Sequence, residues 1–199
     1  MDPAADRRHV MRTMLRRRRA DLSADLQAAA SMAVLARLAP LPVLRGARTV
    51  AGYRGIRGEI DIDAVLTLLV EDGVQVTVPR VEGDDMAFVP WRPDDETVAG
   101  AFGIAEPVGG ERVPFAAHDV VLVPLVAFDA AGNRLGQGGG FYDRAIGSAD
   151  DRPVLIGVAH AFQQVESVPV EPWDQSLDAV VTEEAIHEFR PGVLGRSPS

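Results

Sequence analysis

The sequence contains neither cysteine nor lysine among its 199 residues, and each absence excludes a class of chemistry. Without cysteine, the chain forms no disulfide, offers no thiolate nucleophile and cannot build a cysteine-ligated zinc or iron–sulfur site. Without lysine, Schiff-base catalysis and the lysine of a Walker-type phosphate loop are excluded. The apolar runs, such as residues 120–128, fall far short of the ~20 residues that span a bilayer. We therefore expect no membrane-spanning segment and no membrane partner.

What is present is typical of a folded protein, with 47% apolar and 25% charged residues. A chain of this length buries roughly 70% of its unfolded surface, so a core can form without disulfides. We expect one globular domain over residues 1–190 and a flexible tail over residues 191–199. The lack of cysteine also fits a cytoplasmic protein, although it does not require one.

The charge is distributed unevenly along the chain. All 20 basic residues are arginines, seven of them within the first 19 residues, while the whole chain has a net charge of −9. The remainder is therefore strongly acidic, which argues against a role in coating nucleic acid. A module that binds nucleic acid through its basic N-terminus alone is the alternative that this pattern leaves open.

The basic N-terminal segment is predicted to form an amphipathic helix. The run of arginines at residues 16–19 is not followed by the apolar stretch of a secretory signal, and Asp2 and Asp6 argue against a mitochondrial transit peptide. We expect this run to be a solvent-exposed face, although one or two of the arginines can turn inward to meet an anion. The apolar stripe of the helix would consist of Val10, Met11, Met14 and Leu15.

Helical and strand-like patterns alternate along the rest of the chain, which predicts an α/β fold. We expect a single three-layer Rossmann-like domain with a mostly parallel sheet, whose ligands bind beyond the carboxyl ends of the strands. Residues 93–114 look irregular because glycine and proline recur there. The predicted helices cover residues 23–38 and 63–71, and the predicted strands cover residues 49–53, 75–81, 86–91, 119–128, 154–159 and 177–181.

A glycine-rich segment after the most apolar predicted strand is the strongest candidate for a site. Four glycines within residues 136–140 allow backbone N–H groups to converge on an anion. Arg134 offers a guanidinium fork for phosphate oxygens, and Asp143 offers a hard oxygen ligand for Mg²⁺. The segment matches neither Walker A nor GxGxxG, and for the glycines alone an ordinary flexible loop is the alternative. It reads Arg134-Leu135-Gly136-Gln137-Gly138-Gly139-Gly140-Phe141-Tyr142-Asp143-Arg144.

This segment resembles the signature of the 5-formyltetrahydrofolate cyclo-ligase family, whose members are also called methenyltetrahydrofolate synthetases. Further segments recur in the family's order from about Arg8 to Glu183, and such an ordered set is far more specific than any single motif. These are Tyr53 with Gly58-Glu59-Ile60-Asp61, Val78-Pro79-Arg80, Gly103-Ile104-Ala105-Glu106-Pro107, Asp119-Val120-Val121-Leu122-Val123-Pro124, and Pro169 followed by Trp173-Asp174 and Leu177-Asp178.

The resemblance implies a site for two substrates. The family places a lysine and, four residues later, an arginine against the ATP phosphates, and these positions look like Arg8 and Arg12. Arginine in place of lysine keeps the charge but offers a planar fork instead of a point charge. The implied catalytic residues are Arg134, Tyr142 and Asp143, and the implied Mg²⁺ ligands are Asp143 and Asp174. The implied ATP-binding residues are Arg8, Arg12, Arg134, Leu135, Gly136, Gln137, Gly138, Gly139, Gly140, Phe141 and Tyr142, and the implied folate-binding residues are Arg54, Glu59, Gln137 and Gly140.

The reaction implied by the resemblance is the ATP-dependent cyclisation of 5-formyltetrahydrofolate to 5,10-methenyltetrahydrofolate, with release of ADP and phosphate. Mg²⁺ is the implied cofactor, the partners are these two small molecules rather than nucleic acid, and the protein is expected to be a monomer. A relative of the same fold that binds folate or nucleotide without cyclisation is the alternative.

Several of these residues also have simpler interpretations. Glu59 alone would be a solvated turn residue, and Asp174 a cap or turn residue after a proline. Tyr53 and Trp91 fit the core or a pocket wall, and residues 141–142 could stack on a ring or pack beneath the loop. The four histidines show no metal-binding spacing, so the sequence assigns them no role.

Overall fold

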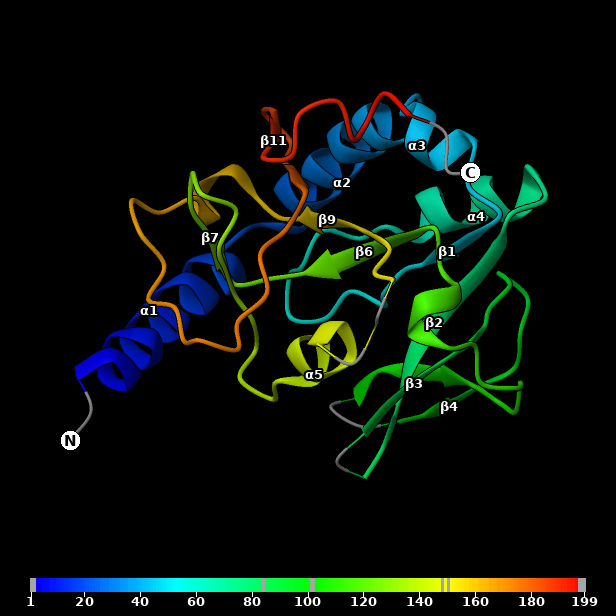
Figure 1. The fold of residues 1–199 in the computed structure, drawn as a ribbon, viewed down its shortest axis with the longest axis horizontal. Coiled ribbons are helices and arrows are strands. Elements are labelled where there is room, and N and C mark those ends of the chain that lie inside the picture. Colours follow the sequence, from blue (N-terminus) through cyan, green and yellow to red (C-terminus); the bar gives the residue numbers. More distant parts are fainter. Residues whose placement is uncertain (1–2, 84, 101–102, 148, 150, 197–199) are drawn as a thin grey trace.

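The computed structural model describes residues 3–83, 85–100, 103–147, 149 and 151–196. Its centre is a seven-stranded sheet in the order β11-β10-β9-β6-β1-β2-β3, and two smaller sheets pair β4 with β5 and β7 with β8 (Figure 1). The strands are β1 (Thr49–Ala51), β2 (Gln75–Glu82), β3 (Asp85–Pro90), β4 (Thr97–Ala99), β5 (Ala105–Pro107), β6 (Val120–Pro124), β7 (Ala127–Phe128), β8 (Arg134–Leu135), β9 (Val154–Val158), β10 (Ala179–Val181) and β11 (Ile186–Glu188).

The sheet is mostly parallel, as expected for an α/β fold. Strands β10, β9, β6, β1 and β2 pair in parallel, and only the two edge strands, β11 and β3, run antiparallel. The five parallel strands have apolar residues on both faces, because helices or loops cover each face. All of these strands except β11 were predicted from the sequence, with bounds that differ by a few residues.

Helices lie on both sides of this sheet: α1 (Pro3–Ala20), α2 (Ala24–Leu38), α3 (Pro42–Arg45), α4 (Asp63–Glu71) and α5 (Phe141–Gly147) (Figure 1). One core cluster joins α2, α3 and α4 to alternate residues of the strands, such as Val50 and Leu122. The neighbouring strand residues, such as Ala51 and Val121, point to the other face and pack with Ile146 of α5. This alternation produces the expected three layers.

Local signals explain where α2 and α3 begin. Ser23 caps α2 by accepting a hydrogen bond from the backbone N–H of Leu26, and α2 ends two residues before Pro40. Pro42 then occupies the first turn of α3, where its missing N–H costs nothing. None of the helices in the described part of the chain is long and apolar enough to cross a bilayer.

Three expectations about the fold are wrong. The strand predicted over residues 119–128 is split, because β6 ends at Pro124 and the chain leaves the main sheet to form β7 with β8. Residues 93–114 contain β4 and β5 rather than only irregular structure. The expected tail is not loose at Val193 and Leu194, which are buried in the core beside α3, whereas residues 197–199 lie outside the described residues.

The apolar stripe of α1 is also only half right. Met11 and Leu15 pack against β7 and β8, as expected of an apolar stripe. Val10 and Met14, however, are 54% and 66% exposed. The face of α1 that meets the protein therefore extends beyond the apolar residues.

Candidate functional site

A cavity of about 820 Å³ opens beyond the carboxyl ends of β1, β2 and β6. This is the expected place for a ligand in an open parallel sheet. Of the residues that the resemblance implied, only Leu135 is not part of the cavity wall, because its side chain is buried in the core with α1. The wall includes Arg8, Arg12, Arg54, Glu59, Arg134, Gly136, Gln137, Gly138, Gly139, Gly140, Phe141, Tyr142, Asp143 and Asp174.

The glycine-rich loop connects β8 to α5 and lies along one wall of the cavity. Gly138 and Gly140 have φ values of +105° and +66°, a conformation that glycine adopts without strain. The glycines therefore allow the loop to hold a defined conformation and do not serve only to make it flexible.

We expect Gly138→Ala to raise the KM for the nucleotide by about ten-fold or more, because a Cβ at this φ costs about 1–3 kcal/mol and the loop must move to relieve it. Steady-state kinetics measures this change. Gly73→Ala is the matched control, since Gly73 also has a positive φ and open space around it but lies outside the cavity wall. Equal effects of the two substitutions on KM would contradict the assignment of the loop.

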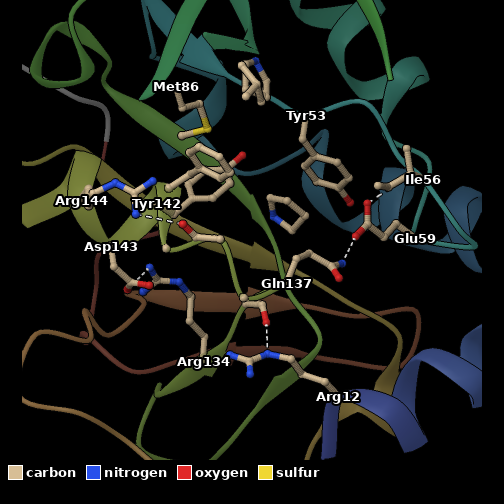
Figure 2. A pocket seen from close by; sticks show the side chains of 18 of the residues that line it. Arg12, Tyr53, Ile56, Glu59, Met86, Arg134, Gln137, Tyr142, Asp143 and Arg144 are labelled. Carbon is tan, nitrogen blue, oxygen red and sulfur yellow. Dashed lines mark hydrogen bonds and ion pairs between the residues drawn. The ribbon is translucent and has the colours of Figure 1, made fainter. Parts of the chain in front are cut away.

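One face of α1 forms the opposite side of the cavity and carries arginines at helical spacing. Arg12 donates from Nε to the carbonyl of Gly136 at 2.9 Å, which ties α1 to the glycine-rich loop (Figure 2). Arg16 reaches the next residue, Gln137, with 2.9 Å to Oε1 and 2.5 Å to the backbone carbonyl. Arg8 pairs with Asp174, with 3.0 Å between Nη2 and Oδ2.

These arginines are crowded. The pKa of Arg12 is lowered by burial and then by the nearby charges of Arg8 and Arg16, while Asp174 opposes the shift. Three cations on one wall repel one another unless an anion lies between them, and the effect is strongest where water is excluded. The electrostatics of this wall therefore favour a polyanionic ligand.

The expectation for residues 16–19 was a solvent-exposed face from which one or two arginines can turn inward, and two of the four do so. Arg16 lines the cavity, and Arg19 is only 1% exposed. Arg17 and Arg18 are exposed as expected. The spacing of four between Arg8, Arg12 and Arg16 is the sequence signal that could have identified Arg16, because residues four apart lie on the same helix face.

Two carboxylates border the cationic part of the cavity. Asp143 accepts a hydrogen bond from Arg134 Nη2 at 2.7 Å, and Arg134 also donates to the carbonyl of Gln175 (Figure 2). Asp174 accepts from Arg8 and from the backbone N–H of Glu171. Within the described ranges, no group of three or more His, Cys, Asp or Glu side chains could hold a metal by itself. Two carboxylates together with phosphate oxygens nevertheless fit Mg²⁺, which is usually bound in this way.

Glu59 lies across the cavity from Arg134 and Asp143 and next to Gln137 (Figure 2), and the structure excludes its interpretation as a solvated turn residue. Its carboxylate accepts from Gln137 Nε2 at 2.5 Å and from the backbone N–H of Ile56 at 3.1 Å (Figure 2). Burial raises the pKa of Glu59, and the adjacent Arg19 partly opposes this shift. An ionised carboxylate has about four acceptor sites, so Glu59 can still accept a hydrogen bond from a ligand.

Aromatic and apolar side chains line the remaining wall. Tyr53 and Tyr142 both border the cavity, and the buried hydroxyl of Tyr142 has no hydrogen-bond partner among the described residues (Figure 2). Tyr142 also packs against the core beneath α5, whereas Trp173 is 65% exposed at the cavity wall. Trp91 lies in the core, as its simpler interpretation predicted. The cavity thus combines a cationic half with a half suited to a flat, partly apolar ring.

Comparisons with known proteins show which family the chain is similar to. The profile of the "5-formyltetrahydrofolate cyclo-ligase family" matches residues 4–183. The 5-formyltetrahydrofolate cyclo-ligase of Escherichia coli K12 is 35% identical over 182 residues, which cover 88% of this chain and all of the relative. The enzyme of that name from Mycolicibacterium smegmatis is 36% identical over 146 residues, which cover 68% of this chain and 73% of the relative.

Solved structures show the same relationship. The 5,10-methenyltetrahydrofolate synthetase of Aquifex aeolicus superposes with a TM-score of 0.82 at 35% identity, covering 93% of this chain and 94% of the other. The synthetase from Mycoplasma pneumoniae, at 23% identity and a TM-score of 0.73, shares the fold. The profile, the relatives and the solved structure at 35% identity lead to the same conclusion: the chain belongs to the 5-formyltetrahydrofolate cyclo-ligase family.

Proposed function

We propose that this protein uses MgATP to cyclise 5-formyltetrahydrofolate to 5,10-methenyltetrahydrofolate, releasing ADP and phosphate. The observation that carries the proposal is a single cavity with a crowded arginine wall and glycine-rich loop at one end and the buried Glu59 at the other. We infer that the triphosphate binds at the first end and the ring system of the folate at the second. We further propose that the enzyme acts as a monomer.

The chemistry requires activation of a poor electrophile. The formyl group on N5 is amide-like, and its oxygen is a poor leaving group. In the proposed reaction this oxygen attacks the γ-phosphorus as the bond from that phosphorus to the bridging oxygen of ADP breaks. N10 then attacks the formyl carbon and loses its proton, and the original formyl oxygen departs as part of phosphate. No protein nucleophile is needed, so the protein's contribution is positioning and stabilisation of charge.

The residues of the cationic end have distinct proposed roles. Arg8, Arg12 and the N–H groups of the glycine-rich loop bind phosphate oxygens, and Arg134 orients Asp143 while facing the transferring phosphoryl group. Asp143 and Asp174 are the proposed ligands of Mg²⁺, which, when bound, neutralises charge on the phosphates. Removing water from this end strengthens each of these interactions.

The other end is proposed to bind the folate. Glu59 accepts a hydrogen bond from an N–H group of the ring, and Tyr53 and Tyr142 form the wall against which the ring packs. Gln137 connects the two ends, since its backbone belongs to the glycine-rich loop and its side chain binds Glu59. In this proposal N5 and its formyl group lie between the two ends, within reach of the γ-phosphate.

We expect the purified protein to form methenyltetrahydrofolate only when ATP and Mg²⁺ are both present, as followed by the near-ultraviolet absorbance of the product. Removing the metal with excess chelator abolishes formation, because the phosphates then lose their neutralising cation. Turnover that continues undiminished in chelator would contradict the assignment of Mg²⁺. Binding of both ligands without any product would instead favour the alternative, a non-cyclising relative.

A further inference from the structure

We propose that Arg19 is a positioning residue: from α1 it fixes the carboxylate of Glu59, and the turn that carries Glu59, at the folate end of the cavity. The part of this inference that concerns the ligand of Glu59 rests on the proposed function. Arg19 itself is not part of the cavity wall, so it acts through Glu59 rather than on a substrate.

The geometry places Arg19 directly behind Glu59. Its Nη1 lies 3.4 Å from Glu59 Oε1, and the side chains of Arg19 and Glu59 are 2% and 6% exposed. Its Nε donates to the backbone carbonyl of Arg57 at 3.0 Å. A single buried guanidinium therefore binds both the carboxylate and the backbone two residues before it.

The turn that Arg19 holds is strained and needs such support. Arg57 and Gly58 have φ values of +52° and +76°, and the N–H of Glu59 donates to the carbonyl of Ile56 at 3.0 Å, as in a type I′ turn. Arg57 is a non-glycine residue in the left-handed region, a strained conformation that persists only where surrounding contacts over-determine it. His160 supplies another such contact, with 2.9 Å between its Nε2 and the carbonyl of Gly58.

The packing of this turn against α1 also explains why residue 58 is glycine. A Cβ built on Gly58 would lie 2.9 Å from the backbone carbonyl oxygen of Arg19, closer than side chains tolerate. The turn and the last part of α1 therefore pack backbone against backbone. Because the two backbones lie so close together, the contact from the Arg19 guanidinium to Glu59 fixes the direction of the carboxylate.

The contact between Arg19 and Glu59 has a measurable effect on the pKa of Glu59. Burial raises the pKa of Glu59, and Arg19 is the first of the groups that lower it again. The other ionisable groups facing Glu59 are Arg16 of α1, Tyr53 after β1 and Tyr142 of α5. A carboxyl group loses its negative charge as the pH falls through its pKa. Because removal of Arg19 raises the pKa of Glu59 further, Glu59 then loses its charge at a higher pH.

The test compares Arg19→Met, Arg19→Lys and the exposed control Arg17→Met. In Arg19→Met we expect the Glu59 carboxyl, followed by ¹³C NMR and assigned with Glu59→Gln, to titrate at a higher pH than in the wild type. The KM for 5-formyltetrahydrofolate rises about ten-fold, while the KM for ATP changes less than about two-fold. Arg19→Lys restores most of the titration shift because it keeps the charge, and Arg17→Met matches the wild type in every measurement.

An unchanged Glu59 titration together with an unchanged folate KM in Arg19→Met would overturn the proposal, as would equal rises in both KM values. If Arg19→Met does not fold, the proposal is tested by titrating the wild-type protein. The ¹⁵Nε resonance of Arg19 must then titrate with the same midpoint as the Glu59 carboxyl and stop moving in Glu59→Gln, and independent midpoints would overturn the proposal. Absence of product formation by the wild type would contradict the proposed function alone, because both titrations are measured without substrate.

Discussion

Replacing Arg12 with methionine is expected to lower kcat/KM for ATP by about ten- to a hundred-fold, because a charge-assisted contact to phosphate is worth roughly 1.5–3 kcal/mol. Arg12 lines the cavity between two other cations, and its Nε already binds the glycine-rich loop through Gly136. Loss of its charge therefore removes a phosphate ligand and loosens the loop at the same time. Steady-state kinetics at physiological salt measures the effect.

Arg17→Met is the matched control for this substitution. Arg17 lies on the same helix but is exposed and outside the cavity wall, so its charge is screened from a bound phosphate. If Arg12→Met behaved like Arg17→Met, Arg12 would not bind the phosphates of ATP; if Arg8→Met also did so, the phosphates would be held by the loop over residues 134–143 alone.

Asp143→Asn is expected to lower kcat by about ten-fold or more with little change in the KM for the folate. The amide has the shape of the carboxylate and can still accept a hydrogen bond from Arg134, so the change mainly removes a negative charge next to the transferring phosphoryl group. The concentration of Mg²⁺ needed for half-maximal rate should rise in parallel. Rates measured over a Mg²⁺ titration separate the two effects.

The exposed Asp94 provides the control, because Asp94→Asn makes the same change in net charge outside the cavity wall. Its kcat and Mg²⁺ dependence should equal those of the wild type. A wild-type Mg²⁺ dependence in Asp143→Asn would remove Asp143 from the metal site and leave Asp174 as the candidate.

The sequence predicts most of the central sheet because the burial pattern there is simple. Strands such as β6 and β9 are apolar on both faces, and α4 was predicted with its observed bounds of Asp63–Glu71. The exit of the chain from the sheet after Pro124 was not predictable from hydropathy, since residues 125–128 are as apolar as β6 and are equally buried in other contacts. Apolar composition specifies burial but not the partner strand.

The glycine-rich part of the site was found from the sequence because its residues are contiguous. The site residues on α1 were only partly predicted, because the inward face of the helix was inferred from its apolar residues alone. This helix covers the cationic part of the cavity, so its inward face carries Arg12 and Arg16, and Arg19 is buried against Glu59, while Met14 is exposed to solvent. The contact between Arg19 and Glu59 joins residues 40 positions apart, and no local pattern predicts it.

The fate of the formyl oxygen tests the proposed reaction most directly. With 5-formyltetrahydrofolate labelled with ¹⁸O in its formyl group, the protein should release phosphate that carries one ¹⁸O atom for each methenyltetrahydrofolate formed, as measured by mass spectrometry. This result is predicted because the oxygen accepts the γ-phosphoryl group before it leaves. Release of unlabelled phosphate, or of labelled phosphate without product, would contradict the account.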